Sequence, residues 1–195
     1  METVLLPAMI SAATATAAGE LSDFDAVVQL HRPAIFRFVL ASLRDQDAAE
    51  TLTQECFLRA YRARDGFRGD AMVKTWLMRI AVNLVRDHLS NERLKFWRRT
   101  QRSSVDLSVA QTWLADRRSS PEAEFQAKQQ VAAVWAAVAQ LPEGQRTVFL
   151  LRFVEEMEIL EIAAATGLKE GTVKIHLFRA LRNVRAKLTE SKETA

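Results

Sequence analysis

The chain has 195 residues, of which 49% are hydrophobic and 26% charged, a balance typical of compact proteins with one or two domains and not of disordered chains. Its single cysteine, Cys56, excludes an intramolecular disulfide and an all-cysteine zinc site, and the histidines His31, His88 and His176 are too scattered to predict a metal cluster. We therefore expect no metal, no cofactor and a reducing, cytoplasmic location.

Charge is distributed unevenly along the chain, although the formal net charge is only +3. Basic residues concentrate at 86–102 and at 169–192, and the stretch 106–161 carries more acids than bases. Two basic patches around an acidic centre are typical of a protein that contacts a polyanion at two points. Two solvated helix faces would give the same pattern, so charge alone does not decide between these interpretations.

We do not expect the N-terminal stretch 1–19 to be a signal peptide. It is rich in Ala and Thr, but no Lys or Arg precedes Arg32, so the basic region of a signal peptide is missing. No later segment reaches about eighteen uncharged apolar residues, and we expect no insertion into a membrane.

Helical periodicity dominates, so the predicted fold class is all-α. Asp23 is placed to cap a first helix, and Pro33 to start or kink a second segment. The turn at 44–47 precedes a helix over about 48–64, in which Cys56 is expected in the core.

A loop with two glycines separates this helix from another over about 74–89. The segment brings aromatic, amide and basic groups close together, and these are the groups that bind an unpaired base and its backbone. Composition alone is weak evidence for such a site. We expect Trp76 in the core and Lys74, Asn83 and Arg86 at the surface.

The segment 101–120 is rich in serine and weakly periodic, which predicts a linker between two domains. Beyond it, Ser120 is expected to cap a helix that begins at Pro121 and runs to about 141. Further helices are expected over about 143–154, 159–166 and 170–188.

Residues 159–188 have the rhythm of a helix-turn-helix. Ala164 is expected to let the two helices approach, Gly167 to take the turn at positive φ, and Leu168 to form a buried wedge. Val173 begins the inner face of the second helix. The outer face of that helix is expected to carry Lys174, Ile175, Phe178, Arg179, Arg182 and Arg185. Such a cationic face suits docking in the major groove, and we favour this interpretation over a solvated charged helix.

Several motifs together carry a resemblance to a known family. They are Gln54–Tyr61 (QECFLRAY), Phe67–Asp70 (FRGD), Thr75–Asn83 (TWLMRIAVN), Leu141–Pro142 and Gly171–Lys174 (GTVK). In this order, and across most of residues 23–188, they closely resemble the bacterial extracytoplasmic-function (ECF) sigma factors of the sigma-70 family.

The resemblance implies an organisation and a function. It implies a tail at 1–22, a sigma region 2 domain at 23–100, a flexible linker at 101–120 and a sigma region 4 domain at 121–192. Such a protein is an alternative sigma factor without an active site of its own. It recruits RNA polymerase core to promoter DNA, recognises and melts the minus-ten element, and binds the minus-thirty-five element. Members of the family are commonly held inactive by an anti-sigma factor, which is often membrane-bound.

The resemblance also implies site residues. The surface that contacts the clamp region of core polymerase would comprise Asp47, Glu50, Gln54, Glu55, Leu58 and Arg59, with Thr51 where the family often has an acid. The loop with Phe67 and Arg68, together with Asn83, would bind a flipped base of the minus-ten element, with Lys74, Arg79 and Arg86 on the nearby backbone.

In region 4, which would also contact the polymerase flap, the resemblance implies a second DNA surface. Thr172, Lys174, Phe178 and Arg179 match the family's minus-thirty-five contacts, with Arg182 and Arg185 as phosphate contacts. Ile175 stands where a small polar residue is usual, and an outward Ile175 would read a thymine methyl group.

Interpretations from two other classes remain open. An autonomous helix-turn-helix repressor or activator, with 23–100 as a sensor domain, would bind duplex DNA alone, whereas a sigma factor binds promoter DNA appreciably only with core polymerase. An enzyme could use acids such as Asp45, Asp47 and Glu50. However, no Gly-rich phosphate loop, nucleophile elbow or His-acid constellation supports an enzyme.

Overall fold

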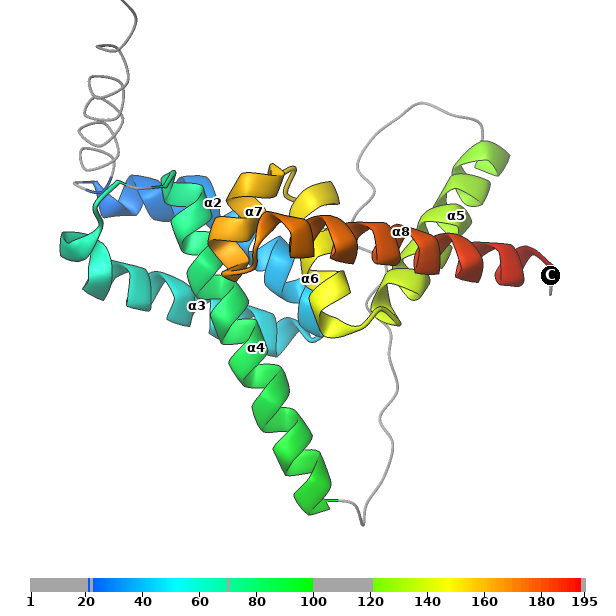
Figure 1. Ribbon diagram of the computed structural model, residues 1–195, viewed down its shortest axis with the longest axis horizontal. Helices are drawn as coiled ribbons and strands as arrows, with labels where there is room; N and C mark the ends of the chain where they lie inside the picture. The colour runs from blue at the N-terminus through cyan, green and yellow to red at the C-terminus, as the bar shows by residue number, and fades with distance from the viewer. Residues whose placement is uncertain (1–20, 22, 70, 100–120, 194–195) are drawn as a thin grey trace, which may run out of the picture.

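The computed structural model describes residues 21, 23–69, 71–99 and 121–193, and every regular element within them is helical (Figure 1). The elements are α2 (Phe24–Leu43), α3 (Gln46–Ala63), the 3-10 turn η1 (Arg64–Gly66), α4 (Val73–Arg99), α5 (Pro121–Ala139), α6 (Glu143–Phe153), α7 (Ile159–Thr166) and α8 (Glu170–Glu193). The all-α prediction is confirmed. The expected tail and linker lie outside the described residues.

Acidic side chains cap α2 and α3: α2 begins after Asp23 as predicted, and α3 begins at Gln46, two residues before its expected start. The Asp23 carboxylate accepts a hydrogen bond from the backbone N–H of Ala26 at 3.1 Å, and Asp45 accepts one from Ala48 at 2.9 Å. Each carboxylate satisfies a backbone donor that the first helical turn leaves without a partner. The cap residues of α2 and α3 therefore fix where these helices begin.

Pro33 lies inside α2, so of its two expected roles the start of a separate helix is wrong. A proline removes one backbone hydrogen bond from a helix interior. Val27 before Pro33 and Phe38 after it are buried, at 4% and 0% exposure. The two halves of α2 therefore share a core face, and the apolar burial offsets the lost hydrogen bond.

Within the described residues, helices α2, α3 and α4 pack on one another around a shared core. Phe38, Cys56 and Leu77 contribute one fully buried side chain from each helix. The prediction that Cys56 fills the core is thereby confirmed. The longest of these helices, α4, continues about ten residues past its expected end near Leu89, and six of those residues are the good helix formers Glu, Arg, Leu and Lys.

The other four helices form a second group, in which α8 packs against α5, α6 and α7. The bounds of α6 and α7 match the sequence prediction closely. Buried Val148, Leu151, Ile162 and Val173 join α6, α7 and α8 in one core.

The two groups also contact one another. Helix α7 lies against α4, and α6 lies beside α2, so residues far apart in the sequence meet in the middle of the molecule (Figure 1). The long connection through residues 100–120 joins the two groups covalently.

Candidate nucleic-acid interface

Gly167 makes the turn between α7 and α8. It adopts a left-handed conformation with φ of 74°, and its N–H donates to the carbonyl of Ala163 at 2.9 Å. Only glycine takes this conformation without strain, so the predicted role of Gly167 is confirmed. Ala164, expected between the helices, is exposed, and the neighbouring Ala165 is buried at 1% exposure instead. The small residue between the two helices therefore lies one position later on α7 than predicted.

The outer face of α8 carries the side chains predicted there. All six of them are exposed: Lys174, Ile175, Phe178, Arg179, Arg182 and Arg185. The two apolar ones, Ile175 and Phe178, are 52% and 68% exposed, whereas Val173 on the inner face is fully buried. Leu168 and Thr172 are partly buried. Helix α8 therefore presents a mixed cationic and apolar row on its free side.

Contacts between α6 and α8 hold this row in position. The amide of Asn183 donates to Gln145 Oε1 at 2.9 Å. At Gly144 the two helices pack closely, because a Cβ added there would lie 3.3 Å from the ring of His176. The orientation of α8 is therefore fixed by α6 along much of its length.

A cavity of about 310 Å³ opens where the loop after η1 meets the start of α4. Phe67, Arg68, Trp76 and Arg79 line it, and the Phe67 and Trp76 rings lie 4.9 Å apart between centroids. Trp76 is partly buried against the core, as expected, but one side of it faces this cavity. Asn83 is exposed on α4 and does not line the cavity.

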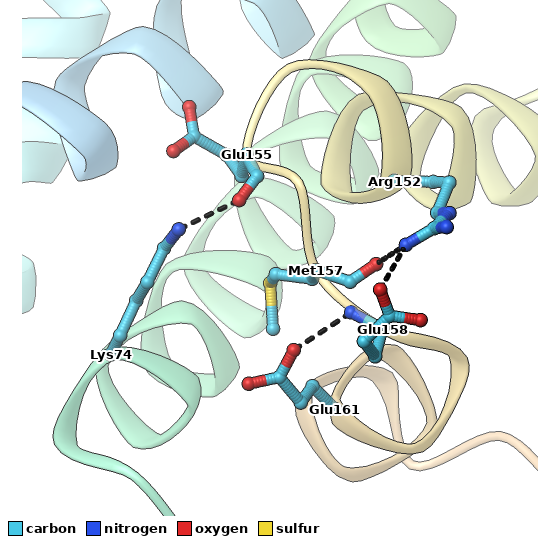
Figure 2. A network of polar contacts seen from close by, with 6 residues as sticks. All are labelled: Lys74, Arg152, Glu155, Met157, Glu158 and Glu161. Carbon is cyan, nitrogen blue, oxygen red and sulfur yellow. Dashed lines mark hydrogen bonds and ion pairs between the residues drawn. The ribbon is translucent and has the colours of Figure 1, made fainter.

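Two of the predicted backbone contacts are already engaged within the molecule. The Lys74 ammonium donates to the carbonyl of Glu155 at 2.7 Å, as Figure 2 shows, and Lys74 is partly buried where the sequence predicted a surface position. Arg86 is exposed, but one of its guanidinium nitrogens donates to the carbonyl of Thr166 at 3.4 Å. Arg79 stays exposed.

The predicted polymerase-binding residues share the outer face of α3. Asp47, Gln54, Leu58 and Arg59 are exposed, and Leu58 is an apolar side chain 43% open to solvent. The other two residues form ion pairs: Glu50 with Arg32, and Glu55 with Arg59, each at 2.7 Å. Such pairs on a surface contribute little to stability, so these carboxylates stay free to exchange partners.

Comparison with known proteins identifies the family. Residues 27–103 match the family model for sigma-70 region 2, and residues 132–184 match that for sigma-70 region 4. The RNA polymerase sigma-H factor of Pseudomonas aeruginosa is 33% identical over 83% of this chain and 84% of its own length. The chain belongs to the ECF group of the sigma-70 family.

Other relatives agree with this assignment. The ECF sigma-E factor of Escherichia coli K12 is 31% identical over 83% of this chain and 84% of its own. The sigma factor RpoE of Bartonella quintana, solved in complex with the anti-sigma factor NepR, shares the fold with a TM-score of 0.70 at 20% identity, over 86% of this chain and 97% of that one.

The protein is thus an alternative sigma factor that directs promoter-specific transcription initiation. The relatives are sigma factors rather than autonomous repressors, so the comparisons do not favour the autonomous alternative. Among the described residues, no helix is long and apolar enough to cross a membrane, and no group of His, Cys, Asp and Glu could hold a metal ion.

One pair of residues in this sigma factor has no signal in the sequence. Glu155, after α6, has a side chain with 0% exposure, and both of its oxygens accept hydrogen bonds from Arg37 on α2, at 3.0 and 2.8 Å. Burial raises the pKa of the Glu155 carboxyl, while the hydrogen bond and charge of Arg37 and the charge of Lys74 oppose that rise. No local sequence pattern signals this pair, because 118 positions separate its members.

Proposed function

We propose that this sigma factor binds DNA at two separate surfaces and core polymerase at a third. The outer face of α8 reads the minus-thirty-five element in the major groove. The loop and cavity at the start of α4, with Asn83 further along the helix, bind the melted minus-ten element. The outer face of α3 docks on the clamp region of RNA polymerase core, while the region 4 domain contacts the flap.

The observation that carries this proposal is the exposed row on α8. It begins directly after a helix-turn-helix turn, where the helix N-terminus attracts phosphate, and it includes long cationic side chains that reach base edges or backbone. Ile175 and Phe178 add exposed apolar atoms that fit thymine methyl groups. Two large apolar side chains exposed close together among cations are more typical of a binding surface than of a solvated helix face.

The cavity at the start of α4 supports the second surface. Phe67 and Trp76 offer aromatic faces, while Arg68 and Arg79 offer charge for a backbone phosphate. An unpaired base stacks on aromatic groups of this kind. The polymerase surface is supported by the exposed Leu58, set among polar side chains that form only surface ion pairs.

The same proposal extends to the partners. Solved relatives include RpoE with NepR, and CnrH with the cytosolic domain of CnrY, which shares the fold at a TM-score of 0.62 and 24% identity over 93% of this chain and 97% of that one. We expect this sigma factor to bind an anti-sigma factor as well, to act in the cytoplasm beside polymerase, and to have no catalytic activity of its own.

Run-off transcription on a library of genomic fragments tests the proposal. With core polymerase and the purified protein, a subset of fragments should give transcripts that core polymerase alone does not produce. Gel shifts on those fragments should require core polymerase. A strong shift of duplex DNA by the protein alone, without any new transcript, would instead support an autonomous repressor or activator.

A further inference from the structure

Helix α7 and the α6–α7 loop, residues 154–158, contact α4 on the side that carries the candidate minus-ten contacts. Lys74 at the start of α4 donates to the Glu155 carbonyl at 2.7 Å, and Arg86, further along, donates to the Thr166 carbonyl at 3.4 Å. Ala164 on α7 forms part of the wall of the cavity that Phe67 lines. Three separate contacts thus place region 4 against the proposed binding side of α4.

The α6–α7 loop is held in one conformation by its own hydrogen bonds. Arg152 donates both to the Met157 carbonyl at 3.0 Å and to the Glu158 carboxylate at 2.9 Å, and the Glu158 N–H donates to Glu161 at 2.7 Å (Figure 2). Met157 is buried at 2% exposure beneath them. The loop is therefore a preformed element that can present Glu155 to α2 and α4.

Glu155 is the centre of the contact. Its carbonyl binds Lys74, and its carboxylate forms a bidentate ion pair with Arg37, whose side chain remains 35% exposed. Bidentate Arg–carboxylate pairs are geometrically specific, so this pair favours one orientation of region 4 on region 2, beside the packing of α7 on α4 and of α6 on α2. We call the ion pair the Arg37–Glu155 latch.

This closed arrangement cannot engage both promoter elements at once. The elements are named for positions 35 and 10, so roughly 25 base pairs, or about 85 Å of B-form duplex, separate them. In the closed molecule Thr166 contacts Arg86, and at most about 20 Å of chain separates Thr166 from Thr172. The minus-ten and minus-thirty-five surfaces are therefore far too close together to span the promoter.

We infer that the Arg37–Glu155 latch holds an autoinhibited state, in which the α6–α7 loop and α7 engage Lys74 and Arg86 of the minus-ten surface until the two domains separate. The inference rests on the proposed function, since it concerns access to the minus-ten surface assigned there. In the closed state Lys74 and Arg86 bind backbone carbonyls of region 4 and are withheld from DNA phosphates.

The energetics allow the latch to open. A buried ion pair gives little net stabilisation, because separating the domains returns both charges to water. The connection at residues 100–120 reaches about 70 Å when extended, so it permits a wide separation. Removing only Arg37 has a different effect, because closure would then bury the Glu155 charge without its partner.

The test compares Arg37→Gln with Arg37→Gln/Glu155→Gln. The single variant should open the molecule, and the double variant should close it again, because no unpaired charge is then buried. Arg62→Gln on the exposed end of α3 is the matched control. Spin labels at Gln29→Cys on α2 and Ala186→Cys on α8, both exposed positions, report the separation by pulsed electron resonance, and buried Cys56 stays unlabelled.

The wild-type protein and the control should give one dominant short distance, whereas Arg37→Gln should add a longer population.

In run-off transcription with core polymerase at subsaturating protein, Arg37→Gln should raise the rate about three- to tenfold, and the double variant should return it toward wild type. An Arg37→Gln distance distribution like that of wild type would overturn the latch. An open Arg37→Gln protein that transcribes at the wild-type rate would overturn the autoinhibition. If the wild-type protein supports no transcription, the proposed function fails, while the distances still report on the latch.

Discussion

Cys56 is enclosed between α3 and α4 and has no access to solvent. Its Sγ donates to the Leu77 carbonyl at 3.6 Å, and burial raises the pKa of the thiol to about 12. Since the thiolate is the reactive species, this single cysteine is a core side chain and not a redox sensor. The chemistry of this residue is set by packing alone.

The prediction for Cys56 is that iodoacetamide at pH 8 leaves it unmodified in the native protein. Relative to an unperturbed thiol, the raised pKa lowers the thiolate fraction about a thousandfold, and burial also blocks the reagent. Mass spectrometry should show full modification once guanidinium unfolds the chain. Rapid modification under native conditions would mean that α3 and α4 separate readily.

At the scale of single elements, the turn before α8 depends on one glycine. Gly167 has a φ of 74°, with nothing within 4 Å of a Cβ added to it, so the cost of a side chain there is backbone strain and not a clash. Gly171, in the first turn of α8, also has open space around it, but its φ is not positive. The two glycines therefore form a matched pair.

Gly167→Ala should lower the free energy of unfolding by about 1 to 2 kcal/mol, because the left-handed backbone conformation destabilises an L residue by about that amount. Gly171→Ala should leave it unchanged or raise it by up to about 1 kcal/mol, since alanine favours the helix. Urea denaturation followed by circular dichroism measures both. Equal effects of the two substitutions would contradict the role assigned to the turn.

The outer face of α8 should divide into residues that read bases and residues that bind backbone. Lys174 and Arg179 lie toward the helix start and reach base edges, so replacing either with Ala should cost about 1 to 3 kcal/mol on the preferred upstream element and relax choice at one or two base pairs. Arg185 lies further along, so Arg185→Ala should weaken binding to all sequences alike and reduce the salt dependence by about one counterion.

Holoenzyme binding to promoter variants at several salt concentrations measures both effects. If Arg185→Ala altered base preference while Lys174→Ala and Arg179→Ala did not, α8 would enter the groove in another orientation.

The elements that could be predicted from the sequence are those fixed by interactions between residues close together in the chain. The starts of α2 and α3 and the turn at Gly167 were predictable, because each depends on one side chain acting on its own backbone neighbours. The continuation of α2 past Pro33 was not, since it depends on burial against other helices. The outward row on α8 was predicted from periodicity, and its exposure is confirmed.

At the scale of the whole molecule, the arrangement of the two domains had no sequence signal. Arg37 and Glu155 lie 118 positions apart, and neither belongs to a motif. Lys74 was expected at the surface because nothing local indicates that a carbonyl of the α6–α7 loop lies within reach of it. Contacts of this kind arise only once both domains are folded.

Each domain nevertheless has buried apolar side chains of its own. Phe38 and Leu77 are buried among α2, α3 and α4, whereas Val148 and Ile162 are buried among α6, α7 and α8. The proposed polymerase surface on α3 and the proposed upstream-element surface on α8 lie on different domains. Polymerase binding and promoter choice should therefore be separable.

A chain truncated from Ala123 onward should keep measurable affinity for core polymerase but lose recognition of the minus-thirty-five element, because α8 and its turn are removed while α3 is intact. It should also bind a single-stranded minus-ten oligonucleotide more tightly than the full chain does, since Lys74 and Arg86 lose their carbonyl partners in region 4. Competition with a labelled full-length protein for core polymerase measures the first effect, and fluorescence anisotropy of the oligonucleotide measures the second. Parallel loss of polymerase affinity and promoter choice, in a fragment whose circular dichroism remains helical, would show that the two domains act as one unit.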